Sequence, residues 1–267
     1  MIKLQRINNE MNPPKIRDLF YQHEGRLIHK WDHYFDIYDK HFEKYAGQPV
    51  NILEIGVSHG GSLQLWKKYF GGAANIYGID INPECKQFEE GNIKIFIGSQ
   101  EDKSFLDSVL AALPPLDIII DDGGHTMSQQ ITSFEKLFLK LKEGGIYLIE
   151  DTHTSYWDEF HGGLRKRGSF IEYSKNLIDS LYDSHVHDKR KITINEMTGH
   201  ISGISFYDSI VVFEKKHRPA PYHIRKGSET IEPYQPTTLK KPSLLMRIKE
   251  RFFGKVNTWQ ANDRGKV

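Results

Sequence analysis

The sequence predicts an α/β protein with a doubly wound, mostly parallel sheet of seven strands. Two observations predict this fold: short apolar runs alternate with helical stretches between residues 50 and 149, and two further runs joined by a tight turn follow at 201–215. Alternation of this kind places parallel strands in one sheet with helices on both faces. We expect a helical N-terminal segment (1–48), a central domain (49–216) and a basic, proline-containing tail (217–267).

The parallel strands are predicted from five short apolar runs. The first ends in a glycine-rich turn, and the last two end in acidic pairs. The five runs are Val50–Ile55, Asn75–Ile79, Ile93–Ile97, Leu116–Ile120 and Ile146–Ile149.

The segments between these runs are predicted to be helical. Helices are expected up to Phe70, over Lys103–Leu110, and over Gln129–Lys142, where Gly144 and Gly145 end the last one. In the N-terminal segment, aromatic and apolar residues recur near the three-to-four spacing of a helix. These residues are Phe20, Leu27, Trp31, Tyr34, Phe35, Tyr38, Phe42 and Tyr45.

An insertion near residues 152–190 separates the fifth run from two final ones. Ile201–Tyr207 and Ile210–Lys215 are joined only by Asp208 and Ser209. A connection this short cannot cross over a sheet, so the two runs are predicted to form an antiparallel pair.

The composition is that of an ordinary globular protein. Of 267 residues, 38% are hydrophobic and 27% charged, and the net charge of +1 argues against a nucleic-acid partner. The one cysteine, Cys85, excludes an internal disulfide framework and a cysteine-rich zinc site. No run resembles a signal peptide or approaches the roughly 18 apolar residues of a membrane helix, so we expect a cytoplasmic location.

The tail carries the only marked charge asymmetry. From residue 217 to the end it has eleven Lys or Arg against four Asp or Glu, a net charge of +7. Residues Ser243–Val256 have the pattern of a basic amphipathic helix. We favour packing of this helix on the protein's own body or on a partner subunit over contact with an anionic membrane, and we expect a homo-oligomer.

A glycine-rich turn after the first predicted strand indicates a ligand site. Residues 54–62 have the sequence EIGVSHGGS. Glycines let the backbone approach a ligand, and the next helix begins with free backbone donors, where Ser62 could act as a cap. Ligands of open α/β sheets bind at this end of the strands. A tight turn without a ligand is the alternative.

Glu54 favours a particular nucleotide. The dinucleotide-binding motif has glycine at the position of Glu54, and a carboxylate there would repel a pyrophosphate. S-adenosylmethionine carries a sulfonium and an ammonium group, which nearby carboxylates attract. Asp80, at the end of the second predicted strand, is placed to accept hydrogen bonds from ribose hydroxyls in either case. The turn therefore favours the methyl donor.

Two acidic pairs follow neighbouring strands. Asp121-Asp122 precedes Gly123-Gly124-His125, and Glu150-Asp151 follows the fifth run. The carboxyl ends of neighbouring parallel strands lie close together, and crowded carboxylates repel one another unless a base, a shared proton or a metal intervenes. Oxygen ligands without cysteine point to Mg²⁺, Mn²⁺ or Ca²⁺. Solvated strand ends are the alternative.

These motifs resemble the magnesium-dependent sugar O-methyltransferases, a group of the class I S-adenosylmethionine-dependent methyltransferases. The resemblance is carried by residues 116–125 (LDIIIDDGGH) and 150–157 (EDTHTSYW) and extends over roughly residues 50–160. Five parallel strands and a final hairpin also form the class I sheet. The resemblance implies S-adenosylmethionine as methyl donor and Mg²⁺ (or Mn²⁺) as metal. It implies Asp122, Glu150 and Asp151 as metal ligands and His125 as general base.

The resemblance also completes the expected cofactor site. Adenine is usually held at the end of the third strand in this fold, which favours Gln100. The residues assigned to the cofactor are Glu54, Gly56, Ser58, Ser62, Asp80, Gln100 and Asp121. Two departures from the group's pattern are Gly124, where serine is common, and Ser99, where aspartate is usual. In the N-terminal segment, His29, Lys30, His33 and Tyr34 lie where such proteins cover the cofactor, but the spacing favours helix packing.

Methyl transfer to a hydroxyl oxygen is a reaction that a bound metal ion would assist. We take the pKa of water, about 15.7, as that of an unactivated hydroxyl. This pKa is about nine units above that of a histidine, which is near 6.5. Complete deprotonation by His125 alone would therefore cost on the order of 12 kcal/mol. A divalent cation that binds the hydroxyl lowers this cost, and His125 then accepts the proton during transfer. Two adjacent sugar hydroxyls could chelate such an ion.

Three residues after the second acidic pair are candidates for acceptor binding. His153 is also the reserve candidate for the base, whereas Tyr156 and Trp157 could stack on a sugar ring or pack in the core. The sequence thus predicts an O-methyltransferase acting on a sugar of a polysaccharide or glycosylated natural product. A metal-dependent methyltransferase of catechols or other phenols, a non-catalytic nucleotide-binding module and a nicotinamide oxidoreductase are the alternatives.

Overall fold

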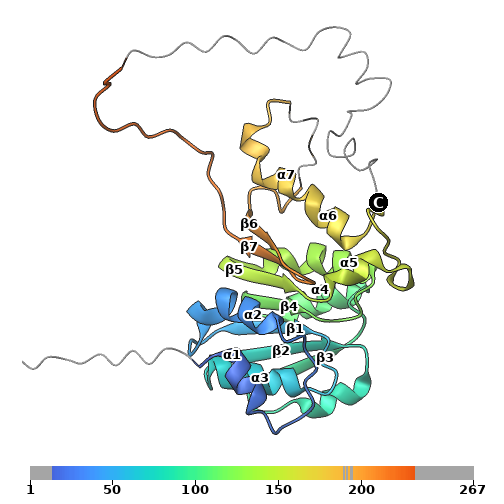
Figure 1. The fold of residues 1–267 in the computed structure, drawn as a ribbon. Coiled ribbons are helices and arrows are strands. Elements are labelled where there is room, and N and C mark those ends of the chain that lie inside the picture. Colours follow the sequence, from blue (N-terminus) through green and yellow to red (C-terminus); the bar gives the residue numbers. More distant parts are fainter. Residues whose placement is uncertain (1–13, 189, 191, 193–194, 232–267) are drawn as a thin grey trace, which may run out of the picture. The chain divides into compact units, whose positions relative to one another are not determined.

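A computed structural model describes residues 14–188, 190, 192 and 195–231, and these residues form a single mixed sheet flanked by helices (Figure 1). The strand order is β3-β2-β1-β4-β5-β7-β6. The strands are β1 (Asn51–Ile55), β2 (Asn75–Asp80), β3 (Ile93–Ile97), β4 (Leu116–Asp121), β5 (Leu141–Ile149), β6 (Ile201–Phe206) and β7 (Val211–Lys215).

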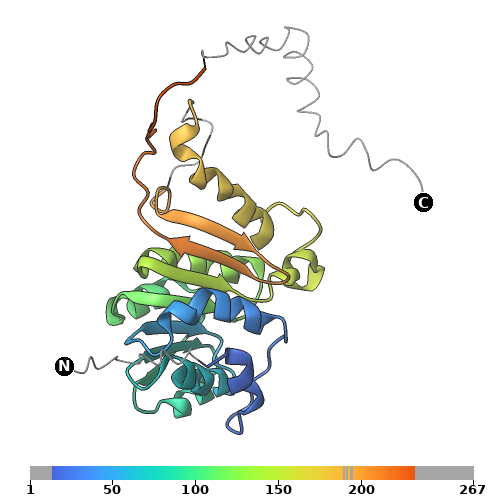
Figure 2. The ribbon, with the colours of Figure 1, turned by 60° about the vertical axis from the view of Figure 1, so that its left-hand side comes forward.

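The first five strands run parallel, and β7 pairs antiparallel with both β5 and β6. In Figure 2, β6 and β7 (orange) extend the sheet beyond β5, and the helix α7 (Ile178–Leu181) lies beside β6. The predicted doubly wound α/β fold with a final antiparallel pair is confirmed.

Two hydrophobic cores lie on opposite faces of the sheet, because successive residues of a strand point to opposite sides. Ile52 of β1 packs with Trp66 of α3 (Gly61–Phe70) on one face. Leu53 packs in the other core with Phe134 of α5 (Met127–Leu137). The first core also takes residues from α1 (Ile16–Tyr21) and α2 (Tyr34–Phe42), and the second from α4 (Lys103–Ala112) and α6 (Phe170–Asn176).

Short 3₁₀ helices complete the described elements. They are η1 (Glu43–Tyr45), η2 (Pro83–Phe88), η3 (Phe138–Lys140), η4 (Thr152–Tyr156), η5 (Asp158–Phe160) and η6 (Asp183–His185). The insertion after β5 contains η4, η5, α6, α7 and η6, so most of it is helical.

The N-terminal segment differs from the expected run of helix. It contains α1 and α2, and residues 22–33 between them form no helix. There the chain crosses the start of α3: the Arg26 N–H donates to Gln64 Oε1 at 2.9 Å, and the Arg26 guanidinium donates to the Gly60 carbonyl at 3.3 Å. These tertiary contacts replace the helical hydrogen bonds, and Leu27 and Trp31 are consequently exposed.

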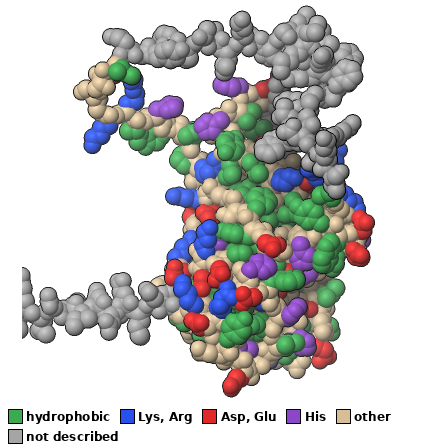
Figure 3. All heavy atoms as spheres, viewed as in Figure 1, with side chains coloured by type: hydrophobic (Ala, Val, Ile, Leu, Met, Phe, Trp, Pro, Cys, Tyr) green, Lys and Arg blue, Asp and Glu red, His purple; other side chains and the backbone are tan. Residues whose placement is uncertain are grey.

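Ion pairs link the two N-terminal helices at the surface. Acidic and basic side chains lie interspersed over α1 and α2 on the face drawn in Figure 3. Among them, Lys15 Nζ is 3.3 Å from Glu43 Oε1, and the Arg17 guanidinium is 2.9 Å from Asp36 Oδ2.

The boundary between α5 and β5 also differs from the prediction. The Thr126 hydroxyl and Gln129 form a capping box that starts α5 earlier than predicted, and the helical turns end at Lys140. Gly144 and Gly145 do not end a helix but lie inside β5. Gly144 has a φ of +81° next to a shift in the β4–β5 register, so these glycines form an irregularity in a longer strand.

The chain divides into two units, residues 1–221 and 222–267. Of the second unit the structure describes residues 222–231, which contain neither helix nor strand. The amphipathic helix predicted at Ser243–Val256 lies outside the described residues. Within the described part, no helix is both long enough and apolar enough to cross a membrane.

The contact between the N-terminal segment and α3 can be tested at Gly61. A Cβ there would lie 2.2 Å from the Arg26 carbonyl oxygen and 2.4 Å from that of Leu27. Gly61→Ala is expected to lower the free energy of unfolding by about 1–3 kcal/mol in urea denaturation, because two backbone atoms must move. Gly72→Ala is the matched control, since a Cβ at Gly72 meets no atom within 4 Å. Equal stability of the two variants would contradict the described contact.

Candidate active site

Two adjoining cavities lie at the carboxyl ends of the parallel strands. The Asp80 cavity, of about 220 Å³, is lined by residues that follow β1 to β4, including Asp80 and Gln100. The His125 cavity, of about 270 Å³, is lined by His125, Asp151 and part of the N-terminal segment. Gly56, Ser58, Asp122 and Gly123 line both. The fold therefore brings the glycine-rich turn after β1 and the acidic pair after β4 to one crevice.

Gly56 allows the loops after β1 and β4 to touch. Its φ is +93°, and a Cβ built there would lie 1.9 Å from the Asp122 carbonyl oxygen. Its N–H donates to the Ile79 carbonyl of β2 at 2.8 Å. Only glycine fits this close approach, which keeps backbone rather than side chain at the wall between the two cavities.

Asp80 and Ser58 form the polar rim of the Asp80 cavity. The Ser58 N–H donates to Asp80 Oδ2 at 2.9 Å, and the Asn82 N–H donates to Asp80 Oδ1 at 2.8 Å. Two backbone donors thus fix the direction of the carboxylate at the end of β2.

Glu54 lies behind the crevice and lines neither cavity. Its carboxylate accepts hydrogen bonds from Ser62 Oγ at 2.8 Å and Trp66 Nε1 at 3.1 Å, and it is fully buried. Burial raises the pKa of Glu54 to about 7, although Lys30 opposes the shift. Ser62, predicted as a cofactor residue, lines the His125 cavity. It does not cap α3, because the cap position is Gly60 and the Ser62 hydroxyl donates to Glu54.

Asp121 is the last residue of β4 and Asp122 follows it directly, so their side chains point to opposite sides of the sheet. Asp121 is buried and accepts hydrogen bonds from Ser133 Oγ at 2.5 Å and Gln100 Nε2 at 3.0 Å. Burial raises the pKa of Asp121 to about 6. Gln100 Oε1 accepts the Gly124 N–H at 2.7 Å. Asp121 therefore supports Gln100 and the glycine loop from behind, and only Gln100 of these two side chains lines a cavity.

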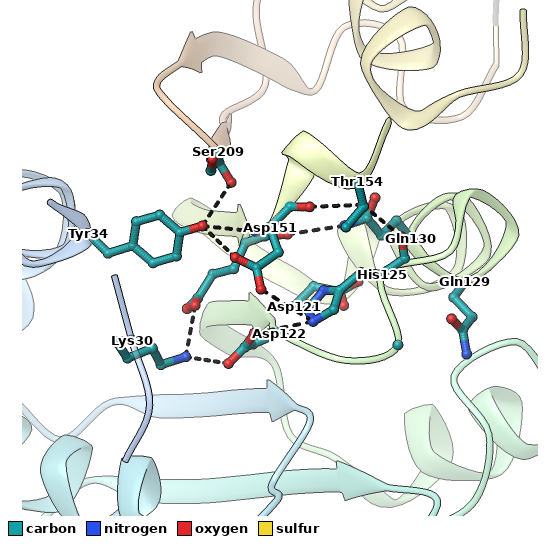
Figure 4. Close-up of polar contacts among 12 residues, drawn as sticks. Lys30, Tyr34, Asp121, Asp122, His125, Gln129, Gln130, Asp151, Thr154 and Ser209 are labelled. Carbon is teal, nitrogen blue, oxygen red and sulfur yellow. Dashed lines mark hydrogen bonds and ion pairs between the residues drawn. The ribbon is translucent and has the colours of Figure 1, made fainter. Parts of the chain in front are cut away.

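A cluster of two carboxylates and one imidazole faces the His125 cavity (Figure 4). Asp122, His125 and Asp151 each offer one possible ligand atom, and these three atoms lie within 4.8 Å of one another. His125 Nε2 is 3.7 Å from Asp122 Oδ1 and 3.5 Å from Asp151 Oδ2. His125 Nδ1 is buried and has no hydrogen-bond partner among the described residues. Nε2 is consequently the ring nitrogen through which His125 meets the other two groups.

The backbone of this cluster is held by one hydroxyl. His125 has a φ of 57° and Asp151 a φ of 51°, an uncommon conformation for non-glycine residues. Thr154 Oγ1 lies 2.9 Å from the carbonyl oxygens of both residues, within hydrogen-bonding distance of each. Thr154 thereby ties the loop after β4 to the loop after β5.

Glu150 does not join this cluster. Its side chain is buried; Oε1 accepts from the Tyr38 hydroxyl at 2.7 Å, and Oε2 accepts from Lys30 Nζ at 2.8 Å. Burial raises the pKa of Glu150, and the Lys30 ammonium opposes that shift. Of the three carboxylates predicted as metal ligands, the structure brings Asp122 and Asp151 together with His125 and turns Glu150 toward the N-terminal segment.

Lys30 and Tyr34 are site residues that the sequence did not assign. Lys30 Nζ also contacts Asp122 Oδ2 at 2.5 Å, and the Lys30 side chain is only 3% exposed. Burial lowers the pKa of Lys30, but Asp122 and Glu150 raise it more, so the ammonium stays charged. The Tyr34 hydroxyl donates to Asp151 Oδ1 at 2.6 Å. In the sequence, both residues lie in the segment that covers the cofactor in similar proteins, but their spacing favoured packing within a helix. The feature that could have identified the site is a lysine within a stretch of aromatic residues.

His153 and Tyr156 line a third cavity, the Tyr156 cavity, of about 490 Å³. Lys175 and Asp208 contribute charged groups to it. His153 Nδ1 is 4.0 Å from Asp151 Oδ1, so this cavity begins beside the acidic cluster. Trp157 is half exposed and its ring centroid is 4.6 Å from that of His153, but it does not line the cavity.

Proteins of known activity resemble this chain in sequence and structure. Mycinamicin VI 2''-O-methyltransferase from Micromonospora griseorubida is 36% identical over 189 residues, which cover 67% of this chain and 47% of that protein. Demethylmacrocin O-methyltransferase from Streptomyces fradiae is 36% identical over 203 residues, covering 71% and 51%. MycE methyltransferase of the mycinamycin pathway, solved with Mg and SAH, matches with a TM-score of 0.70 at 32% identity, covering 76% of this chain and 55% of that one.

The chain has the class I methyltransferase fold and resembles the sugar O-methyltransferases. No protein-family model matches the sequence. The chain spans about half the length of the curated relatives it matches.

The raised pKa of Glu54 predicts a pH effect on stability in this methyltransferase fold. The folded chain binds the Glu54 proton more tightly than the unfolded chain, whose ordinary value is 4.5. This stabilisation is fully present below pH 4.5 and is lost as the pH rises to about 7. Between pH 5 and 7.5, the free energy of unfolding of the wild type should fall by about 2 kcal/mol relative to Glu54→Gln, measured by urea denaturation. Parallel pH curves for the two proteins would contradict the assignment.

Proposed function

We propose that the chain is an S-adenosylmethionine-dependent, divalent-metal-assisted O-methyltransferase acting on a sugar hydroxyl of a polysaccharide or glycosylated natural product. The observation that carries the proposal is the cluster of Asp122, His125 and Asp151 facing a cavity that adjoins the glycine-walled Asp80 cavity. The relatives are named as O-methyltransferases of natural products, one of them a rhamnosyl tetracenomycin, and MycE was solved with Mg and SAH, which supports the same chemistry.

The methyl donor would lie across the two adjoining cavities. Asp80, fixed by two backbone donors, would accept hydrogen bonds from the ribose hydroxyls, and Gln100 would contact the adenine side. Gly56 and Ser58, which line both cavities, would meet the donor at its middle. We propose that Glu54 and Asp121 act indirectly, through Ser62 and Gln100, because both carboxylates are buried behind the cavity walls.

The cluster fits a divalent metal ion. Asp122 Oδ1 and Asp151 Oδ2 make no hydrogen bond within the described residues, and both face His125. Carboxylate oxygens are the ligands that Mg²⁺ and Mn²⁺ prefer, and His125 Nε2 is left free to act as a base. When bound, such an ion would lower the pKa of a hydroxyl it contacts.

His125 would take the proton of the acceptor hydroxyl. Its Nδ1 is buried, and its Nε2 lies beside the two carboxylates that line the cavity proposed for the acceptor hydroxyl. The loop conformation that sets this direction is held by Thr154. His153 and Tyr156 of the Tyr156 cavity, with the neighbouring Trp157, are proposed to bind the acceptor, since an aromatic ring covers the apolar face of a sugar and a histidine bonds its hydroxyls.

Binding measurements test the donor and the metal. Calorimetry with SAH, the demethylated donor, is expected to give one site, and Mg²⁺ or Mn²⁺ a second. Asp122→Ala should abolish metal binding, whereas Asp107→Ala should leave both sites unchanged, because Asp107 lies on α4 and pairs with Lys136 outside the cavities. A wild-type chain that binds NADH but not SAH would overturn the proposal in favour of an oxidoreductase.

Turnover measurements test the base and the acceptor. With glycosides that carry adjacent hydroxyls, mass spectrometry should detect one added methyl group. His125→Ala should lower the rate by about 10²–10⁴-fold, the usual contribution of a general base, with SAH affinity within about threefold of wild type. If a catechol but no glycoside is methylated, the acceptor is a phenol and not a sugar. Full activity of His125→Ala would remove the histidine from the mechanism.

A further inference from the structure

Two half-exposed tryptophan side chains lie near the acidic cluster, and only one of them has a part in the proposed reaction. Trp31 of the N-terminal segment is 54% exposed, and Trp157, directly after η4, is 48% exposed. We propose that the two indole rings bind a second sugar ring of the acceptor, next to the ring that is methylated. Trp31 thereby selects acceptors with at least two sugar units. This assignment rests on the proposed function and names the acceptor class within it.

His153 connects the two tryptophans to the reaction site. Its ring centroid is 6.1 Å from that of Trp31 and 4.6 Å from that of Trp157, and both pairs are T-shaped. His153 Nδ1 is 4.0 Å from Asp151 Oδ1. Trp31, His153 and Trp157 therefore form one aromatic row beside the acidic cluster, although the two tryptophans come from segments far apart in the sequence.

The aromatic row lies outside the cavity proposed for the reacting hydroxyl. Residues 27–30 of the N-terminal segment line the His125 cavity, and this lining stops one residue before Trp31. The Tyr156 cavity is lined by His153 and by neither tryptophan. A sugar ring stacked on Trp31 is consequently not the ring whose hydroxyl meets His125. It belongs to the unit next to the methylated one.

The exposed indole rings have the chemistry that a sugar ring requires. A pyranose ring has an apolar face of C–H groups, which stacks on a flat aromatic ring, and hydroxyls at its rim, which accept hydrogen bonds. Neither the Trp31 nor the Trp157 indole N–H has a hydrogen-bond acceptor within the described residues, so each is available to a sugar hydroxyl. Single exposed apolar side chains are common. Two tryptophans around one histidine at the edge of a cavity form a continuous surface instead.

Trp31 is held in place by the residues that follow it. The Tyr34 hydroxyl donates to Asp151 Oδ1 at 2.6 Å (Figure 4), and the Tyr34 N–H donates to the Trp31 carbonyl at 3.0 Å. His33 Nε2 lies 3.2 Å from the Asp208 carbonyl oxygen. The segment is thus fixed to the loops after β5 and β6. A surface that is ordered before the ligand arrives loses less entropy on binding.

Steady-state kinetics with matched monosaccharides and disaccharides test the inference. The probes are methyl glycosides of hexoses and 6-deoxyhexoses, each compared with a disaccharide that has the same sugar as its terminal unit. For the sugar that is methylated, we expect kcat/KM to be about tenfold higher with the disaccharide because of a lower KM. Trp31→Ala should reduce this preference to less than about threefold by raising the KM of the disaccharide, with little change in its kcat.

Further substitutions separate stacking from a structural role of Trp31. Trp31→Phe keeps a flat ring and should retain most of the preference for the disaccharide. Trp31→Leu keeps apolar bulk without a flat ring and should behave like Trp31→Ala. Tyr182→Ala is the matched control and should keep the full preference, since Tyr182 is 58% exposed and lines none of the three cavities. SAH binding, measured by calorimetry, checks the folding of each variant.

Three results would overturn the inference alone. The first is a wild-type chain that methylates the disaccharide no better than the monosaccharide. The second is a Trp31→Ala variant that loses kcat/KM equally with both, and the third is a Trp31→Leu variant with the preference of the wild type. In each case a sugar is still methylated, so the proposed function stands. A wild-type chain that methylates neither monosaccharides nor disaccharides overturns the sugar acceptor and the inference together.

Discussion

Carboxylates that converge at the ends of two neighbouring parallel strands are the constraint on which this structure depends. Asp121 of β4 is in register with Ile149 of β5, so Asp122 and Glu150 follow side by side. Such carboxylates repel one another in a buried place unless cations accompany them. The Lys30 ammonium supplies one positive charge, and it is delivered by a segment 92 residues before Asp122. The path of residues 22–33 across α3 is therefore linked to the charge of the site.

The alternation of side chains along a strand divides the acidic residues into two groups. Asp121 faces α5 and uses its oxygens on Ser133 and Gln100, which shapes the glycine loop. Asp122, one residue later, faces the cavity. Glu54 of β1 is likewise committed to Ser62 and Trp66. Buried carboxylates of this kind organise the walls of the crevice, whereas those beyond the strand ends, Asp122 and Asp151, keep one oxygen available.

Much of the fold could be predicted because its signals are local. Each parallel strand is a short apolar run, and the final pair is fixed by a connection too short for a crossover. The predicted start of β5 was wrong because Gly144 and Gly145 resemble the end of a helix. The strand in fact begins at Leu141, because Leu141 pairs with Leu116 of β4, which is a tertiary interaction. The break between α1 and α2 was missed for a similar reason, since Gln64 and Gly60 of a distant segment bind Arg26.

The parts of the site that depend on the positions of strand ends could be predicted from the sequence. The parts that depend on the direction of individual side chains could not. The meeting of Asp122, Asp151 and His125 follows from neighbouring strand ends. The turn of Glu150 toward Tyr38, and the arrival of Lys30 and Tyr34, depend on contacts over more than one hundred residues in the chain. No periodicity or spacing encodes such contacts. A lysine within an aromatic stretch was the available signal, because a buried ammonium needs carboxylate partners.

The most direct test of this account is a crystal structure of the chain with SAH and Mn²⁺, with the ion located by its anomalous scattering. We expect one Mn²⁺ in the His125 cavity, bound by carboxylate oxygens of Asp122 and Asp151. An ion bound elsewhere, or a His125 cavity without an ion while SAH occupies the Asp80 cavity, would contradict it.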